Sequence, residues 1–196
     1  WAVPLCLVGA IAGILFMLMF QRLRKLMLRL KEHVILRGLI GGIGMGIIGA
    51  LLPLTLFSGE DQSVELIQQA VEIGIVMLVV LAFAKLLATT LLLATGWKGG
   101  YVFPIMFAGV ALGMAINLLF PHLPVAVTVG ATLAGALVAA LRAPLFAALF
   151  TLVFVEYELA AVVAVAVMVS SLGVAFLALR QAQRAEGQEV PDEHGP

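Results

Sequence analysis

Long apolar runs, separated by short polar stretches, make up most of the chain. The first run covers residues 5–20, and with residues 1–3 it reaches the roughly 20 residues that a helix needs to cross a bilayer. Further apolar runs cover residues 38–57, 72–95 and 105–120. Each of these segments is predicted to form a helix, so the pattern indicates a chain that crosses a membrane several times.

The later part of the chain divides its apolar residues unevenly. Residues 125–154 form one long apolar run that Arg142-Ala143-Pro144 interrupts, so two segments separated at the proline are expected. Residues 159–179 form the last predicted span. Short and Gly/Pro-interrupted hydrophobic segments are typical of channels and transporters with discontinuous helices. The predicted fold is therefore an all-α integral membrane bundle of tilted and discontinuous helices.

The composition supports this class of protein. Hydrophobic residues make up 63% of the chain and charged residues 11%, and the mean hydropathy is +1.18. A soluble domain is about 45–50% apolar and about 25% charged. We therefore expect a multi-pass protein of the plasma (inner) membrane. Acidic and basic residues balance at 11 each, so the net charge gives no indication of nucleic acid or of an acidic partner, and nucleic acid is not expected to bind.

Several kinds of site are not indicated by the sequence. Cys6 is the only cysteine, so a disulfide within the chain and a thiolate metal cluster are excluded. We interpret Cys6 as a small buried hydrophobic residue. The apolar segments carry no His-rich cluster and no Ser/His or Asp/Asp pair. An enzyme, a metal site, catalytic residues and an organic cofactor are therefore not expected.

The polar segments suggest an orientation in the membrane. Residues 21–33 and Arg37 hold six of the 11 basic residues, and leucines interleave with them at helical spacing. The positive-inside rule makes this segment an interfacial, cytoplasmic connection. Residues 58–69 carry Glu60, Asp61 and Glu65 without the spacing of cation ligands, so we expect a solvated loop on the opposite side. The chain starts Trp1-Ala2-Val3-Pro4, which suggests the later part of a longer polypeptide.

Small residues and isolated charges add detail to the predicted spans. Gly9 and Gly13 favour close helix contact, as do five glycines between residues 41 and 49, and Pro53 is expected to end or kink its helix. Lys85 lies inside a predicted span. It either pairs with backbone carbonyls or a carboxylate, or it serves an anion pathway. His122 is expected at the surface.

The stretch from Gly96 to Pro104 carries the candidate chemistry. Its sequence is Gly-Trp-Lys-Gly-Gly-Tyr-Val-Phe-Pro, placed between two apolar runs. A glycine pair permits close approach of a ligand to the backbone, and Pro104 suits the first turn of a helix. The stretch therefore predicts a glycine-rich turn that leads into a helix N-terminus at membrane depth. Unpaired N–H groups and the positive end of the helix dipole would there face an anion.

Four features resemble, in order and spacing, the later half of CLC chloride channels and chloride/proton antiporters. Gly99-Gly100-Tyr101-Val102-Phe103-Pro104 is similar to the family's G-G-x-F-x-P anion-site motif. Lys85 and Thr89 resemble its K/R-x-x-x-T helix, and Arg142-Ala143-Pro144-Leu145 resembles its R-A-P-L/I step. Leu52-Pro53 followed by Ser58-Gly59 resembles its L-P…G-G-G turn. The resemblance covers roughly residues 1–180.

The resemblance implies two inverted repeats per subunit, of which this chain supplies approximately the second. It implies a homodimer in the lipid bilayer with one pathway for chloride or similar small anions in each subunit, and chloride as substrate ion rather than cofactor. Residues 1–180 would form the transmembrane domain and residues 181–196 a polar C-terminal tail. The anion-binding residues would be Gly99, Gly100, Tyr101, Val102, Phe103 and Pro104, with the backbone N–H groups of Tyr101 and Val102 on the ion.

The chain also departs from the family pattern. Val102 stands where the family has phenylalanine, and Lys98 is unusual at its position. Lys98 is a candidate, with Lys85, for attracting anions, because a fixed charge raises local anion concentration. Alternatively, Lys98 snorkels to the interface. The gating-glutamate motif, the G-S-G-I-P motif and the late pore tyrosine are not found. An anion channel or chloride/proton antiporter thus remains open beside a non-transporting scaffold half that needs a partner chain.

Overall fold

The computed structural model describes residues 1–154 and 160–186, with side chains up to residue 176. Within that part of the chain the regular structure is helical, which confirms the predicted all-α class. The helices are α1 (Ala2–Met27), α2 (Val34–Leu51), α3 (Glu60–Ile73), α4 (Ile75–Thr95), α5 (Val102–Leu119), α6 (Val125–Leu141), α7 (Pro144–Phe154) and α8 (Ala160–Glu186). Short 3₁₀ turns at Leu28–Leu30 and Pro53–Thr55 follow α1 and α2.

Helix α6 forms the centre of the bundle. It is buried from Thr128 to Ala140, and it packs against α1, α5, α7 and α8. The contact with α1 is made through small residues. A Cβ atom at Gly9 would collide with the Thr132 carbonyl, and a Cβ atom at Gly135 would collide with the Cys6 carbonyl. The predicted small-residue contact of α1 is thereby confirmed, and the two backbones touch directly.

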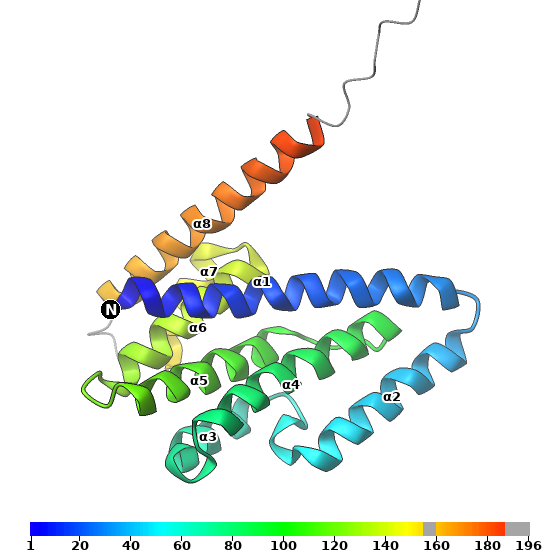
Figure 1. Ribbon diagram of the computed structural model, residues 1–196, viewed down its shortest axis with the longest axis horizontal. Helices are drawn as coiled ribbons and strands as arrows, with labels where there is room; N and C mark the ends of the chain where they lie inside the picture. Colours follow the sequence, from blue (N-terminus) through cyan, green and yellow to red (C-terminus); the bar gives the residue numbers. More distant parts are fainter. Residues whose placement is uncertain (155–159, 187–196) are drawn as a thin grey trace, which may run out of the picture.

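Helix α5 lies between α6 and α4 (Figure 1). Gly109 and Gly113 bring its backbone against Leu133 and Val129 of α6. The Thr132 hydroxyl donates a hydrogen bond to the Gly109 carbonyl at 3.0 Å. Because α5 is buried along most of its length, its first turn is held at a fixed place in the bundle.

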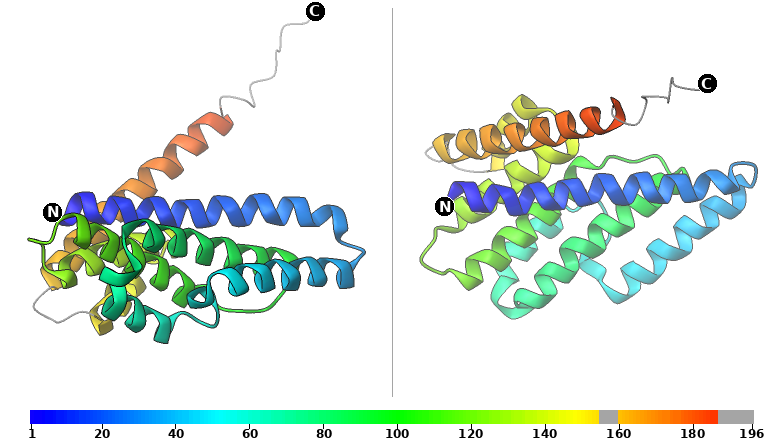
Figure 2. Two further views of the ribbon diagram at one scale, coloured as in Figure 1. Left: turned by 60° about the horizontal axis from the view of Figure 1, so that its bottom comes forward. Right: turned by 45° about the horizontal axis from the view of Figure 1, so that its top comes forward.

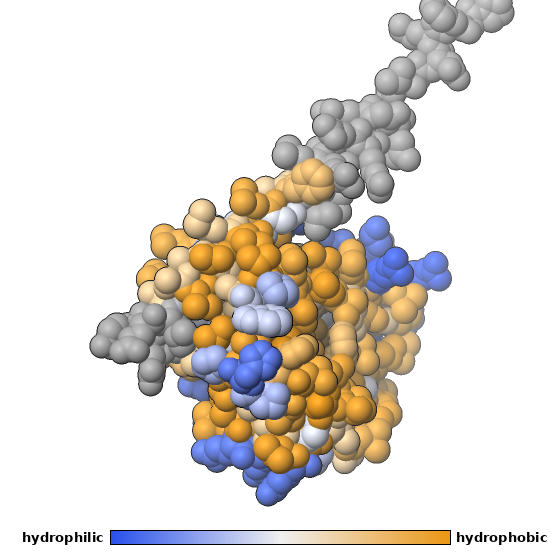
Figure 3. Space-filling model, turned by 60° about the vertical axis from the view of Figure 1, so that its left-hand side comes forward, coloured by the Kyte–Doolittle hydropathy of each residue, from blue (hydrophilic) through white to orange (hydrophobic). Residues whose placement is uncertain are grey.

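The apolar surface fits a lipid environment. Helices α2, α4 and α5, and α1 together with its 3₁₀ extension, are long and apolar enough to cross a membrane, and the apolar part of α8 is shorter. One face of the molecule is mostly hydrophobic, with small polar patches (Figure 3). Large side chains such as Ile35, Val71 and Leu51 are largely exposed. The chain is an integral membrane protein.

The predicted loop at residues 58–69 is wrong, because α3 occupies most of this stretch. Ser63, Leu66 and Ala70 recur at helical spacing and are buried, while the carboxylates lie on the outer side. At its start the Gly59 N–H donates to the Gln62 side chain. The overall polarity of the segment hid this amphipathic pattern.

Several predicted boundaries also moved. The span expected at residues 72–95 begins instead at Ile75, because Gly74, with φ of 76°, separates α3 from α4. Helix α1 continues through the first basic residues to Met27, since arginine, lysine and leucine are good helix formers. The expected break at Pro53 and the split before Pro144 are confirmed.

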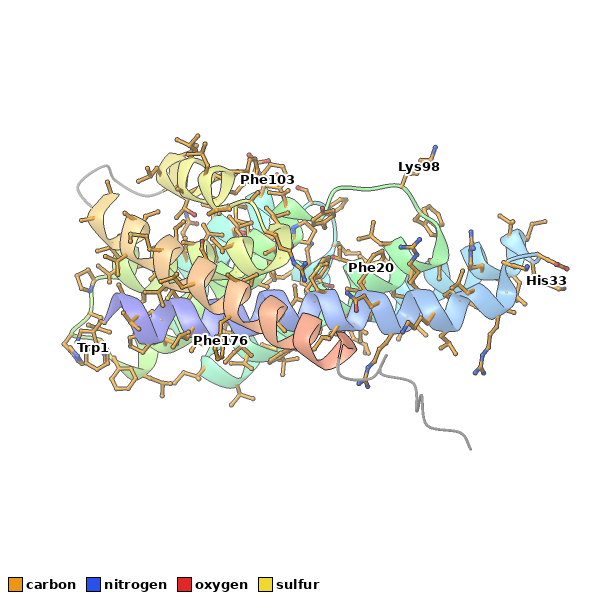
Figure 4. The ribbon with its side chains drawn as sticks, turned by 90° about the horizontal axis from the view of Figure 1, so that it is seen from above. Trp1, Phe20, His33, Lys98, Phe103 and Phe176 are labelled. Carbon is orange, nitrogen blue, oxygen red and sulfur yellow. The ribbon has the colours of Figure 1, made fainter. Side chains whose placement is uncertain are left out.

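The two ends of the described chain lie in different surroundings. Trp1 and His33 mark opposite ends of the bundle (Figure 4), while α8 diverges from the other helices toward its C-terminal end (Figure 2). His122 is exposed, as expected, and its ring contacts those of Trp1 and Phe120. Glu156, which the sequence places in a connection as either a solvated residue or a proton carrier, lies outside the described residues, as do residues 187–196. The predicted polar tail starts within α8, which continues to Glu186.

Candidate anion site at the start of helix α5

A short extended loop connects α4 to α5. Helix α4 ends at Thr95 and is followed by Gly96, which has φ of 98°, a left-handed conformation that favours glycine. The N–H groups of Gly96 and Trp97 donate to the carbonyls of Leu93 and Leu92, which closes the helix end. The loop then runs to Tyr101, and α5 begins at Val102. Figure 4 shows this loop standing away from the helices, with the Lys98 side chain pointing outward.

The first turn of α5 presents unpaired donors. In the part of the chain that the structure describes, the backbone N–H groups of Tyr101, Val102 and Phe103 have no hydrogen-bond acceptor. Pro104 has no N–H and occupies the first turn, as predicted. Three successive donors therefore meet at the positive end of the helix dipole, an arrangement that suits an anion.

The glycine pair ahead of this turn has open space beside it. Apart from the adjacent residues of the chain, no atom of the described structure lies within 4 Å of where a Cβ would stand at Gly99 or Gly100. Neither residue has a positive φ angle, so the backbone conformation does not require glycine there. The pair thus leaves the backbone bare where a ligand would approach.

A cavity of about 170 Å³ borders the loop. Gly99, Gly100 and Pro104 line one side of it, and the opposite side comes from α4 and from the turn before α3. Polar side chains in the lining are those of Thr55, Ser58, Lys85, Thr89, Trp97 and Lys98. The loop, two lysines and several hydroxyls therefore share one space.

Lys85 is paired with backbone carbonyls. It is 1% exposed, and its ammonium group donates to the carbonyls of Thr55, Leu56 and Phe57 at 2.9, 3.1 and 2.9 Å. The ammonium also lies 5.2 Å from the centre of the Phe107 ring. Of the two readings that the sequence left open, carbonyl pairing is the one that the geometry displays. All three donors are used, so Lys85 acts on an anion only through its charge.

Lys98 differs from Lys85 in its exposure and in its hydrogen bonding. It is exposed on the loop, and within the described residues no carboxylate pairs with it. Its position on the cavity lining brings a second positive charge beside the glycine pair. The expected attraction of anions by Lys98 stays a prediction.

Comparison with known proteins identifies the family of this chain. A family model of the voltage gated chloride channel matches residues 1–174. The chain belongs to this family. Among its relatives, the "Putative ion-transport protein YfeO" of Escherichia coli O7:K1 (strain IAI39 / ExPEC) is 35% identical over 119 residues, and that of Salmonella newport (strain SL254) is 37% identical over 119 residues. The alignments cover 60% of this chain and 28% of each relative. No solved structure matches.

Within this voltage gated chloride channel fold, the aromatic residues of the motif point to different neighbours. Tyr101 stacks on Phe16 of α1, with ring centres 5.8 Å apart. Phe103 packs edge-on against Phe150 of α7 at 5.9 Å. The motif residues therefore serve two purposes, since their side chains anchor the turn while their N–H groups remain available. Of the six motif residues, Gly99, Gly100 and Pro104 line the cavity together with Lys98 and Lys85, whereas Tyr101, Val102 and Phe103 are not part of its lining.

Sequence reasoning missed two residues that hold the loop. The Arg37 Nε donates to the Thr95 carbonyl at 2.9 Å, and the Trp97 Nε1 donates to the Gly38 carbonyl at 3.2 Å. The start of α2 is thereby clamped to both sides of Gly96. The partners in these two contacts are separated by 58 and 59 positions in the sequence, so no local sequence pattern predicts them.

Proposed function

We propose that the chain supplies one half of a transmembrane pathway for chloride or similar small anions. The observation that carries the proposal is the run of three unpaired N–H donors at the start of α5 beside a cavity with two lysines. The ion would be held by the backbone N–H groups of Tyr101 and Val102. Gly99, Gly100, Phe103 and Pro104 would shape the same site.

Partial charges at a helix end, rather than a full charge, would hold the ion. A desolvated anion needs compensation, and helix-end dipoles provide roughly half of an elementary charge. A full, unpaired ammonium group at the same place would bind more tightly and slow release. Conduction requires binding that admits the ion and also lets it leave. Because Lys85 is already paired with carbonyls, it offers potential without direct coordination.

The assembly around this half follows from family membership as a proposal. The chain spans 28% of the length of the YfeO relatives, so their activity is not transferred by the match itself. We extend the proposal to a homodimer in the plasma (inner) membrane, with this chain as about the second of two inverted repeats. Chloride is then the substrate ion, and no cofactor takes part. Channel and chloride/proton antiporter are both compatible with the helix-end site.

Reconstitution of the full-length protein in liposomes tests the proposal. Chloride efflux is recorded together with external pH, and chloride binding is measured by calorimetry. Tyr101→Pro removes one donor, while Tyr101→Phe keeps it and serves as the matched control. We expect weaker chloride binding only in the proline variant. Unchanged binding in a folded Tyr101→Pro protein would refute the site, and chloride-dependent proton movement would identify an antiporter.

The same experiment separates transport from a purely structural role. A folded, dimeric protein that neither binds chloride nor moves it would support the alternative of a scaffold half. Loss of folding in Tyr101→Pro is checked by gel filtration and by the melting temperature. If Tyr101→Pro does not fold, chloride binding is measured by calorimetry on Gly100→Ala instead, because the space beside Gly100 accepts a methyl group.

A further inference from the structure

A second cavity lies where α1, α2 and α4 meet, away from the three unpaired N–H groups. Its volume is about 390 Å³. Apolar side chains and two arginines line it: Phe20, Arg24, Met27, Leu28, Arg37, Leu93, Ala94 and Gly96. Arg24 is exposed and Arg37 is partly exposed, and within the described residues no carboxylate pairs with either of them, so both guanidinium groups are available to an anion.

The two arginines approach the cavity from different helices. Arg24 comes from the last turns of α1, and Arg37 from the first turn of α2. Arg37 uses Nε for the Thr95 carbonyl, and its Nη2 lies above Gly96, where a Cβ would stand only 2.8 Å away. The terminal nitrogens of Arg37 have no acceptor in the described part of the chain. Planar guanidinium groups bind phosphate through paired hydrogen bonds.

The surroundings fit a lipid rather than a soluble anion. The end of α1 and the turn after it carry four more basic residues: Arg22, Lys25, Arg29 and Lys31. Leu26 and Leu28 are more than half exposed between them. Basic residues interleaved with exposed leucines are typical of a helix end at the surface of an anionic leaflet.

We propose that this cavity binds the phosphate headgroup of an anionic phospholipid. The phosphate lies between Arg24 and Arg37, and the upper part of an acyl chain packs along Phe20, Leu28 and Leu93. Charge complementarity and the apolar lining together select this occupant. A soluble phosphate satisfies the arginines but leaves the apolar wall exposed to water.

The position of Arg37 gives the lipid an influence on the glycine loop. The residue that binds the phosphate also holds the end of α4, one residue before Gly96. A bound lipid therefore fixes Arg37 in the rotamer that clamps the loop. This coupling rests on the proposed anion site, whereas lipid binding itself does not.

Binding is tested on the full-length protein in a zwitterionic detergent. Dioctanoyl phosphatidylglycerol is titrated and its affinity is read by native mass spectrometry, with dioctanoyl phosphatidylcholine and glycerol 3-phosphate as comparison ligands. Arg24→Gln removes one guanidinium from the cavity. Arg22→Gln removes the same charge from the same helix without touching the cavity, and is the matched control.

We expect Arg24→Gln to weaken phosphatidylglycerol binding about tenfold, the value of one charge-assisted hydrogen bond. Arg22→Gln should change it by less than about twofold, since exposed charges act weakly. Equal losses in both variants would reduce the site to diffuse surface charge and overturn the proposal. Glycerol 3-phosphate binding as tightly as the lipid would reassign the cavity to a soluble phosphate. Because chloride is not part of the assay, failure of the anion site leaves this result unaffected.

Discussion

The Lys85 ammonium group lies 2.9 Å from the carbonyl oxygen of Thr55, a residue 30 positions earlier that is itself fully buried. This bond ties α4 to the turn that connects α2 with α3. Two further carbonyls of the same turn accept hydrogen bonds from the same group. The Lys85 ammonium group therefore provides hydrogen-bond donors for carbonyl groups in a non-helical turn, which would otherwise be unpaired within the membrane.

Replacing Lys85 with methionine should destabilise the protein strongly. The buried Thr55 carbonyl and the two partly buried carbonyls of Leu56 and Phe57 lose their donor, and a buried group left unpaired costs about 1–3 kcal/mol. We expect a lower melting temperature in detergent, measured by intrinsic fluorescence. Lys98→Met is the control, because Lys98 is exposed and its loss should leave the melting temperature unchanged. Equal melting temperatures of Lys85→Met and wild type would show that the carbonyl pairing contributes nothing.

Lys98→Ala should lower anion affinity at low ionic strength. A charge beside the cavity raises the local anion concentration, and this effect is screened over about 10 Å at 0.1 M salt. We expect chloride binding about threefold weaker at low salt and nearly equal to wild type at high salt. Calorimetry at two ionic strengths checks this. If Lys98→Ala bound chloride as tightly as the wild type at both ionic strengths, Lys98 would have no role in attracting anions and would serve only as an interfacial residue.

Gly100→Ala should affect chloride binding, whereas Gly135→Ala should affect the stability of the fold. At Gly100 a methyl group meets nothing within 4 Å, so the free energy of unfolding should change by less than about 0.5 kcal/mol while chloride binding weakens. At Gly135 the methyl group meets the Cys6 backbone and should destabilise the fold by about 1–3 kcal/mol. Melting temperature and chloride calorimetry on both variants measure the contrast. Full chloride affinity in Gly100→Ala would mean that the ion does not approach this backbone.

Trp97→Phe should loosen the loop while preserving its apolar contacts. The variant loses the indole hydrogen bond to the Gly38 carbonyl, which is worth about 0.5–1.5 kcal/mol. Amide hydrogen exchange should become faster at the end of α4 and in residues 97–101. The middle of α6 serves as an internal reference, because it is buried within the bundle. Uniform acceleration across the molecule would indicate global destabilisation instead.

Much of the fold could be predicted from the sequence because prolines mark where several helices end. Pro53 and Pro144 cannot continue a helix, and α2 and α6 end before them, as predicted. Helix α3 was missed because its buried positions, such as Leu66, are few among polar residues. The start of α5 was predicted near Pro104, since glycine and proline mark a helix N-terminus. The Arg37 clamp was not, because its partner Thr95 is remote in sequence.

The backbone contacts between α1 and α6 have a mechanical consequence. At Gly9 and Gly135 the two helices meet without side chains between them, so neither can slide or rotate without a collision. Helices α1 and α6 therefore form a rigid pair in the middle of the molecule. Any displacement that accompanies the proposed passage of an ion then falls on the segments outside this helix pair. Chief among these is the glycine loop, which Arg37 and Trp97 hold at its first end and the stacking of Tyr101 on Phe16 holds at its second end, while Gly99 and Gly100 between them have open space beside them.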